Sequence, residues 1–165
     1  MTARVSIQRQ DFDLGQEVSR LRAHDHGVGA VASFVGTMRD ANDGQGVSAM
    51  ELEHYPGMTE RAIEAMIDEA VPRFGLRGVR IVHRIGALRP GEQIVLVAVT
   101  AAHRGAAFRG CEFLMDYLKT QAPFWKKETT AEGARWVDAR SSDDAAVARW
   151  GLPAGNAAQP PAPKA

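Results

Sequence analysis

One pair of side chains suited to binding an anion stands where an apolar run ends and a helix should begin. His103 and Arg104 come shortly after the apolar run 94–99 and directly before a predicted helix over about 106–120. A helix start exposes unpaired N–H groups and the positive end of its dipole. Arginine can clamp phosphate and histidine can exchange a proton. The pattern indicates an anion site; alternatively, Arg104 is solvated in a loop and His103 satisfies a nearby carbonyl.

A second candidate lies at the far end of the same helix. Lys119 follows Met115 by four residues, so the two share a helix face at the margin of an apolar stripe. Partial desolvation would suit this ammonium to act as an acid, a base or a nucleophile. The alternative is a lysine that favours the helix dipole near the C-terminus and extends to water.

A third candidate is the string Phe124-Trp125-Lys126-Lys127-Glu128, in which two aromatic residues precede two cations. An apolar wall beside cationic groups suits a heteroaromatic ring that carries phosphate. The same string also fits a core anchor followed by a solvated turn. Thr37, Met38 and Arg39 end an apolar segment, where side chains commonly line a cleft, although one arginine is a weak signal by itself.

Other residue types speak against several chemistries. The sequence has no P-loop, no dinucleotide-binding glycine pattern and no CxxC pair. His24 and His26 are spaced like metal ligands, but no matching cysteine or carboxylate cluster accompanies them, so exposed histidines are expected. Cys111 falls on an apolar helix face, which favours a buried structural thiol over a sulfur-carrying nucleophile. If the protein handles sulfur, the sulfur should arrive on another molecule.

Composition indicates a soluble, cytoplasmic, single-domain protein. The 165 residues include 20 Lys plus Arg and 20 Asp plus Glu, so the formal net charge is zero, and 45% are hydrophobic. A nucleic-acid-binding protein usually has a basic surplus, so we expect no nucleic-acid partner. One cysteine fits a reducing compartment. We see no leader and no apolar run long enough to span a membrane, and expect no membrane association.

The elements that must position these candidates alternate along the chain. Apolar helical stripes predict helices over about 14–21, from a cap at Thr59 to about Pro72, and over 106–120. Strands are expected over 4–8, 28–38, 47–55, 79–85, 92–101 and 135–137, with 47–55 returning from 28–38 and the apolar 94–99 central in its sheet. This order predicts an α+β fold with hairpins. Residues 151–165, rich in proline and alanine, are expected to form a disordered tail, and 41–46 a loop without an assigned role.

Taken together, these segments resemble the large, catalytic subunit of molybdopterin synthase. The resemblance extends from about residue 3 to 150. We take residues 1–150 as one domain, and only the 151–165 tail lies outside it. The resemblance is specific because several motifs occur in the same order as in the family, whereas any one motif alone would be a weak signal. The segments that carry it are Ser33–Asp40, Leu52–Met58 (LEHYPGM), His83–Gly86, Ala102–Arg104, Met115–Thr120 and Ala122–Glu128.

The resemblance implies an α/β hammerhead-type single domain with a mixed, largely antiparallel sheet and about three helices. It further implies a homodimer at the centre of a heterotetramer, with a small ubiquitin-like sulfur-carrier subunit whose Gly-Gly terminus is a thiocarboxylate. The implied substrate is cyclic pyranopterin monophosphate, which receives two sulfurs to become molybdopterin. No cofactor or metal is implied, because metal insertion comes later.

The resemblance also assigns roles to residues of this chain. Lys119 and Lys126 would be the catalytic lysines. Arg39, His103 and Arg104 would bind phosphate and pterin. The remaining carry-overs are Thr37, Met38, Lys127 and Glu128 lining the site, Phe34 and Met115 as apolar wall, and Arg140 reaching the neighbouring subunit's site. A non-catalytic anion- or pterin-binding module is the alternative, although it need not retain all these charged residues.

Overall fold

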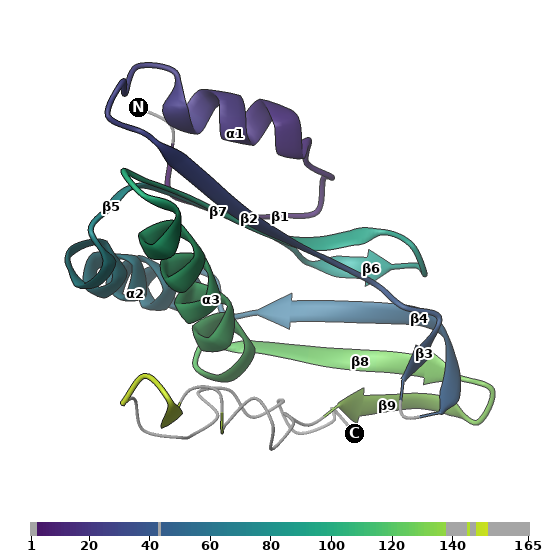
Figure 1. Cartoon of the computed structure of the whole chain (residues 1–165). Helices are drawn as coiled ribbons and strands as arrows, with labels where there is room; N and C mark the ends of the chain where they lie inside the picture. The colour runs from purple at the N-terminus through teal and green to yellow at the C-terminus, as the bar shows by residue number, and fades with distance from the viewer. Residues whose placement is uncertain (1–2, 43, 138–144, 146–147, 152–165) are drawn as a thin grey trace.

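The computed structural model describes residues 3–42, 44–137, 145 and 148–151. The described chain contains three helices and nine strands in two sheets (Figure 1). The helices are α1 (Leu14–Arg22), α2 (Met58–Phe74) and α3 (Arg104–Thr120). The strands are β1 (Val5–Gln8), β2 (Ala30–Thr37), β3 (Ala41–Asn42), β4 (Gln45–His54), β5 (Leu76–Arg84), β6 (Gly86–Leu88), β7 (Gln93–Ala101), β8 (Phe124–Thr130) and β9 (Gly133–Val137).

The first sheet is covered by helices and forms the main core. Its strand order is β1-β5-β7-β2, with β1 parallel to β5 and the other pairs antiparallel. The helices α2 and α3 pack on one face and α1 on the other. Because both faces of β7 are covered, its apolar run Val95–Val99 is almost completely buried. The prediction of a central strand at 94–99 is confirmed.

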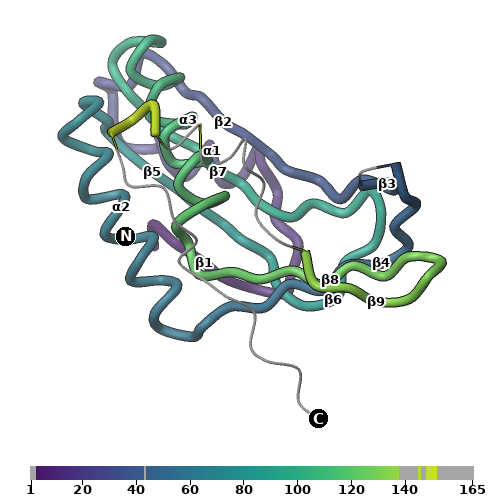
Figure 2. Tube along the Cα trace, turned by 90° about the horizontal axis from the view of Figure 1, so that it is seen from below, coloured from purple at the N-terminus to yellow at the C-terminus, as the bar shows by residue number. Residues whose placement is uncertain are grey.

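The second sheet projects away from the helices. It has the order β3-β4-β8-β9, with β6 pairing to β4 as an additional strand. Figure 2, seen from below, shows these strands extending to one side of the helix-covered part. A smaller apolar cluster lies beneath this sheet, formed by Met38, Val47, Met50, Leu52 and Leu88. The described fold is α+β with mixed and antiparallel sheets in one domain, as the order of elements predicts.

Two local predictions about the strands are wrong. Residues 47–55 do not return beside 28–38: β2 pairs with β7, whereas β4 pairs with β3, β6 and β8. The intervening β3 and its turn redirect the chain from one sheet to the other. Residues 124–130 form β8 in the middle of the second sheet and are not the solvated turn that one interpretation of their charged residues suggested.

The predicted cap at Thr59 is also wrong. The N-cap of α2 is Gly57, at a φ of 81°, and the Glu60 side chain accepts a hydrogen bond from the Gly57 N–H at 2.6 Å. Thr59 is fully buried and ties two elements together instead. Its hydroxyl accepts from the Tyr55 N–H and donates to the Pro123 carbonyl, at 3.0 Å each. The hydroxyl therefore holds the entry of β8 against the start of α2.

Candidate active site

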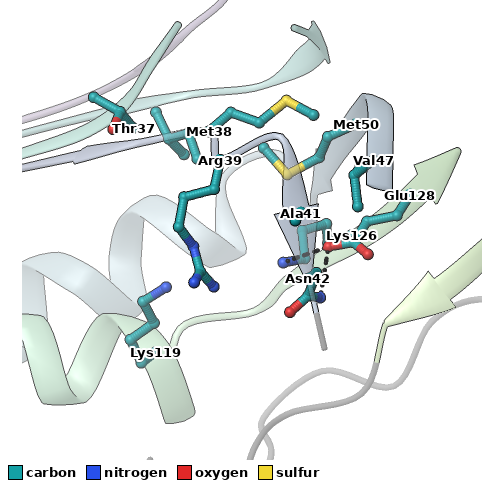
Figure 3. Close-up of a pocket in the computed structure, with 11 residues that line it drawn as sticks. Thr37, Met38, Arg39, Ala41, Asn42, Val47, Met50, Lys119, Lys126 and Glu128 are labelled. Atoms are coloured by element: carbon teal, nitrogen blue, oxygen red, sulfur yellow. Dashed lines mark hydrogen bonds and ion pairs between the residues drawn. The ribbon is translucent and has the colours of Figure 1, made fainter. Parts of the chain in front are cut away.

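The cavity in which predicted site residues gather lies between the C-terminal end of α3 and the inner face of the second sheet. Its volume is about 110 Å³. Six of the predicted residues line it: Thr37, Met38, Arg39, Lys119, Lys126 and Glu128. Ala41, Asn42, Val47, Met50 and Ile94 complete the lining. Residues about 90 positions apart in the sequence thus meet around one space (Figure 3).

The alternation of β8 decides which of its side chains face the cavity. Successive side chains of a strand point to opposite faces, so Lys126 and Glu128 share one face and Lys127 takes the other. The register places Lys126 opposite Leu52 and Glu128 opposite Met50, two residues of the buried cluster beneath the cavity. Lys126 and Lys127 are adjacent in the sequence, but only Lys126 faces the cavity.

Arg39 reaches the cavity from the end of β2. A β-bulge interrupts the β2–β7 register between Gly36 and Thr37, and such bulges redirect the side chains that follow. The Met38 backbone is then fixed by hydrogen bonds with Gly91 and Glu92, at 2.8 and 2.9 Å. In Figure 3 the Arg39 and Lys119 side chains point toward one another from opposite sides of the cavity.

One buried carboxylate lies among the three cations of the cavity. Glu128 is only 3% exposed, and its Oε1 lies 3.2 Å from Lys126 Nζ. Its Oε2 lies 3.6 Å from Arg135 Nη2 and accepts no hydrogen bond from the described residues. Burial raises the pKa of this carboxyl, but hydrogen bonds from Asn42 and Lys126 and the nearby charges of Lys126 and Arg135 hold the net pKa below its ordinary value. Glu128 is therefore ionised at neutral pH.

The cavity lining combines an apolar surface with an excess of positively charged side chains. Met38, Val47, Met50 and Ile94 supply the apolar part. The charged lining is three cations, Arg39, Lys119 and Lys126, against one carboxylate. An apolar surface beside unbalanced cations can hold a flat ring with an attached phosphate. Lys119 is exposed at the cavity margin, so it meets both the cavity and solvent.

His103 and Arg104 do not lie at this cavity. His103 is the N-cap of α3 and Arg104 its first residue, and both are exposed. Lys119 is near the other end of this 17-residue helix. At 1.5 Å per residue, about 23 Å separates Arg104 from Lys119 along the axis. Within one chain, the helix-start pair and the two pocket lysines are separate groups.

The other predicted residues also lie away from the cavity lining. Phe34 is 41% exposed on the edge strand β2, and Met115 packs against the main core. Lys127 lies on the opposite face of β8, with its ammonium 5.7 Å from the Trp136 ring centroid. Arg140 lies outside the described residues.

The sequence assigned no site role to three residues that lie at or near the cavity. Asn42 looked like one turn former among several, yet it is buried and bonded to Glu128. Arg135 reaches Glu128 because β9 pairs with β8. His83 stacks on Phe124 with ring centroids 3.9 Å apart, and burial, with nearby Lys119 and His54, lowers its pKa to about 4 despite a hydrogen bond to the Arg84 carbonyl. No sequence signal identifies Asn42 or Arg135, whereas the His83–Gly86 motif did mark the third.

The remaining candidates have structural or exposed positions. Cys111 is buried as expected, and burial raises the pKa of its thiol to about 11. His24 and His26 are exposed, also as expected. Among the residues that the structure describes, no three His, Cys, Asp or Glu side chains cluster as a metal site would require. No helix in the described part of the chain is both long and apolar enough to cross a bilayer.

The known proteins that this chain resembles in sequence and in fold belong to one class of enzyme. The model of the MoaE protein family matches residues 7–121. The chain is 61% identical over 153 residues to the molybdopterin synthase catalytic subunit of Ralstonia nicotianae, covering 93% of this chain and 87% of that protein. It superimposes with a TM-score of 0.79 on the molybdopterin biosynthesis MoaE protein from Burkholderia ambifaria, at 61% identity, covering 92% and 99% of the two chains.

A more distant structure shares the fold. It is a protein-protein complex of subunits 1 and 2 of molybdopterin-converting factor from Helicobacter pylori, with a TM-score of 0.69 at 20% identity, covering 84% of this chain and 93% of that one.

These findings define an enzyme class. The chain belongs to the MoaE protein family. Its activity is that of a molybdopterin synthase catalytic subunit, which acts in molybdenum cofactor biosynthesis. Of the two interpretations left open by the sequence, the enzyme is therefore the right one, and not the non-catalytic binding module.

Proposed function

We propose that the cavity between α3 and the second sheet is where sulfur passes from a thiocarboxylated carrier protein to cyclic pyranopterin monophosphate. The observation that carries this proposal is that Arg39, Lys119 and Lys126 meet at one cavity, part of whose lining is apolar. The sequence predicted a phosphate-bearing heteroaromatic substrate for the string Phe124–Glu128, and the family resemblance implied that Arg39 and Lys119 act on the same substrate.

The substrate's charge and shape fit this lining. Arg39 offers a planar donor set that can bind two phosphate oxygens, and the ammonium groups of Lys119 and Lys126 add point charges. Met38 and Met50 offer a polarizable surface for the pterin ring. Phosphate binding would thus place the ring over the apolar part and its side chain beside the two lysines.

A separate protein is the proposed source of the sulfur. Cys111 is buried with a raised pKa and lies outside the cavity lining, so it is poorly suited to act as a thiolate. The related Helicobacter protein is described as one of two subunits in a complex. We therefore propose a small ubiquitin-like subunit with a thiocarboxylated Gly-Gly terminus, which can enter the cavity where Lys119 meets solvent.

The chemistry would take place in two rounds that break different carbon–oxygen bonds. The first opens the cyclic phosphate, and in the second the oxygen on the neighbouring side-chain carbon leaves as water. The carrier's thiocarboxylate sulfur attacks a side-chain carbon of the pterin, forming a C–S bond as the cyclic phosphate opens. Water then cleaves the acyl–sulfur bond, leaving a thiolate on the pterin and a carboxylate on the carrier. A second carrier delivers the second sulfur. Lys119 and Lys126 would orient the carrier terminus, offset the developing negative charge and transfer protons.

His103 and Arg104 retain a proposed substrate-binding role only through a second copy of the chain. About 23 Å of helix separates Arg104 from Lys119 in one chain. In the proposed homodimer, a neighbouring copy would bring its own His103 and Arg104, together with Arg140, to this cavity. Phe34 and Met115 remain proposed apolar wall on the same condition, and Lys127 is left outside the proposed site because it lies on the opposite face of β8.

The proposal is tested by reconstitution. Purified chain, cyclic pyranopterin monophosphate and thiocarboxylated carrier should yield a dithiolene product, detected after oxidation to its fluorescent derivative. Lys119→Ala should nearly abolish the product while circular dichroism and carrier binding stay unchanged. Turnover close to the wild-type rate in a folded Lys119→Ala variant would overturn the assignment.

A further inference from the structure

We infer that Asn42 is a positioning residue, which fixes the Lys126 ammonium and joins the strand bearing Lys126 to the segment bearing Arg39. This inference rests on the proposed function, because it assigns Asn42 a role in that site. The residue belongs to the 41–46 loop, to which the sequence assigned no role.

The contact is made between two buried groups. Asn42 is 6% exposed and Glu128 is 3% exposed. The Asn42 side-chain amide donates to Glu128 Oε1 over 2.9 Å, and the same oxygen lies 3.2 Å from Lys126 Nζ. Figure 3 shows both interactions meeting at this carboxylate oxygen. A buried charge-assisted hydrogen bond is strong enough to select one rotamer of the carboxylate.

The carboxylate in turn restrains the lysine. A lysine side chain has four rotatable carbon bonds and large rotamer freedom, and the Lys126 side chain is 34% exposed. A carboxylate fixed two residues along the same strand face defines one position for its ammonium. Arg135 borders the other oxygen of Glu128 at 3.6 Å. Without Asn42, the carboxylate could turn toward Arg135, and Lys126 would lose its fixed partner.

The same hydrogen bond joins two segments that line the cavity. Asn42 follows Arg39 by three residues, and the Asp40 carbonyl accepts from the Val47 N–H at 2.7 Å. Arg39 and Asn42 therefore belong to one short connection between the two sheets. Bonding of Asn42 to β8 sets the separation between Arg39 and Lys126. A fixed separation would place the bound phosphate relative to the lysine, which is what a group-transfer reaction requires.

A matched pair of variants tests the inference. Asn42→Leu removes the amide donor and keeps the number and branching of the side-chain heavy atoms. Gln45→Leu likewise replaces an amide side chain with leucine at the residue that pairs with Asn42 in the β3–β4 hairpin, outside the cavity lining. We expect Asn42→Leu to lower kcat by roughly 10- to 100-fold and to change precursor affinity by less than about threefold. Gln45→Leu should stay within about twofold in both. Equal losses in the two variants, or a near-normal kcat for Asn42→Leu, would overturn the inference.

A second measurement does not depend on activity. The sequence contains four lysines, so ¹³Cε-lysine NMR of the whole chain is simple, and Lys126→Arg identifies the Lys126 signal. A fixed ammonium makes the two Cε hydrogens of Lys126 inequivalent. That splitting should collapse in Asn42→Leu and persist in Gln45→Leu. Its persistence in Asn42→Leu contradicts the inference, whereas a wild-type chain that shows the splitting but yields no product counts against the proposed function alone.

Discussion

The two sheets of this molecule differ in how the charged side chains beside them are paired. At the helix-covered sheet, Arg80 on β5 and Glu17 on α1 are both buried, and their side chains meet at 2.8 Å. In the open sheet, the single carboxylate of Glu128 lies in a cavity with three cations. The first arrangement is neutral and internally complete. The second has more positive than negative side chains, which suits an anionic ligand. The first arrangement therefore contributes to folding stability, and the second to ligand binding.

The largest effect on stability is expected from breaking the buried pair Arg80–Glu17. Arg80→Met leaves Glu17 as a buried charge with no comparable counter-ion, since the nearby Arg20 is 3.8 Å away and mostly exposed. We expect a loss of roughly 3–5 kcal/mol in the free energy of unfolding. Urea denaturation measures it. Product formation by the fraction that remains folded should stay near the wild-type rate, and a specific loss of kcat would break the comparison.

The contact between the two sheets should make folding stability depend on pH. His83, on β5, stacks against Phe124, on β8, and its pKa is lowered to about 4. As the pH falls from about 6.5 to 4, the unfolded chain binds a proton that the folded chain does not, so stability decreases by up to about 3 kcal/mol. His83→Phe keeps an aromatic ring there and should remove this slope.

Thermal unfolding at several pH values measures that slope. His24→Gln, at an exposed histidine, is the control and should keep it. An unchanged acid slope in His83→Phe would mean that other groups cause the loss of stability.

The smallest predicted effect concerns the C-terminal part of the described chain. The Trp150 indole N–H donates to Asp116 on α3 at 2.6 Å, while its ring packs against Phe74 and Phe113. Trp150→Phe keeps most of the ring contact and loses the hydrogen bond, so we expect about 1 kcal/mol of destabilisation by urea denaturation. A loss as large as that of Arg80→Met would show that this anchor belongs to the main core.

Much of the covered sheet could be predicted from the sequence because its signals are local. Apolar residues at helical spacing marked all three helices. Asp13, a typical capping residue, is the N-cap of α1 and accepts from the Gln16 N–H at 2.8 Å. The uninterrupted apolar run of β7 required burial on both faces. These patterns depend on neighbours within one element, so they survive without knowledge of the fold.

The open sheet was harder to predict because its strands depend on distant pairing. The residues Phe124–Glu128 combine aromatic and charged types, which fit a turn as well as a strand, and only pairing with β4 and β9 decides between them. The motifs pointed to a group of cations of which Arg39, Lys119 and Lys126 line the cavity, but they did not indicate that Lys126 and Lys127 face opposite ways. Asn42 bonds to Glu128, 86 positions away in the sequence, and no local pattern marks such a contact.

The most direct test of the central claim compares these two adjacent lysines. Lys126→Ala and Lys127→Ala remove the same group from the two faces of β8, and single-turnover assays with precursor and thiocarboxylated carrier measure the result. We predict a loss of at least roughly 100-fold for Lys126→Ala and less than about threefold for Lys127→Ala. Equal losses, or a larger loss for Lys127→Ala, would contradict the placement of the chemistry in this cavity.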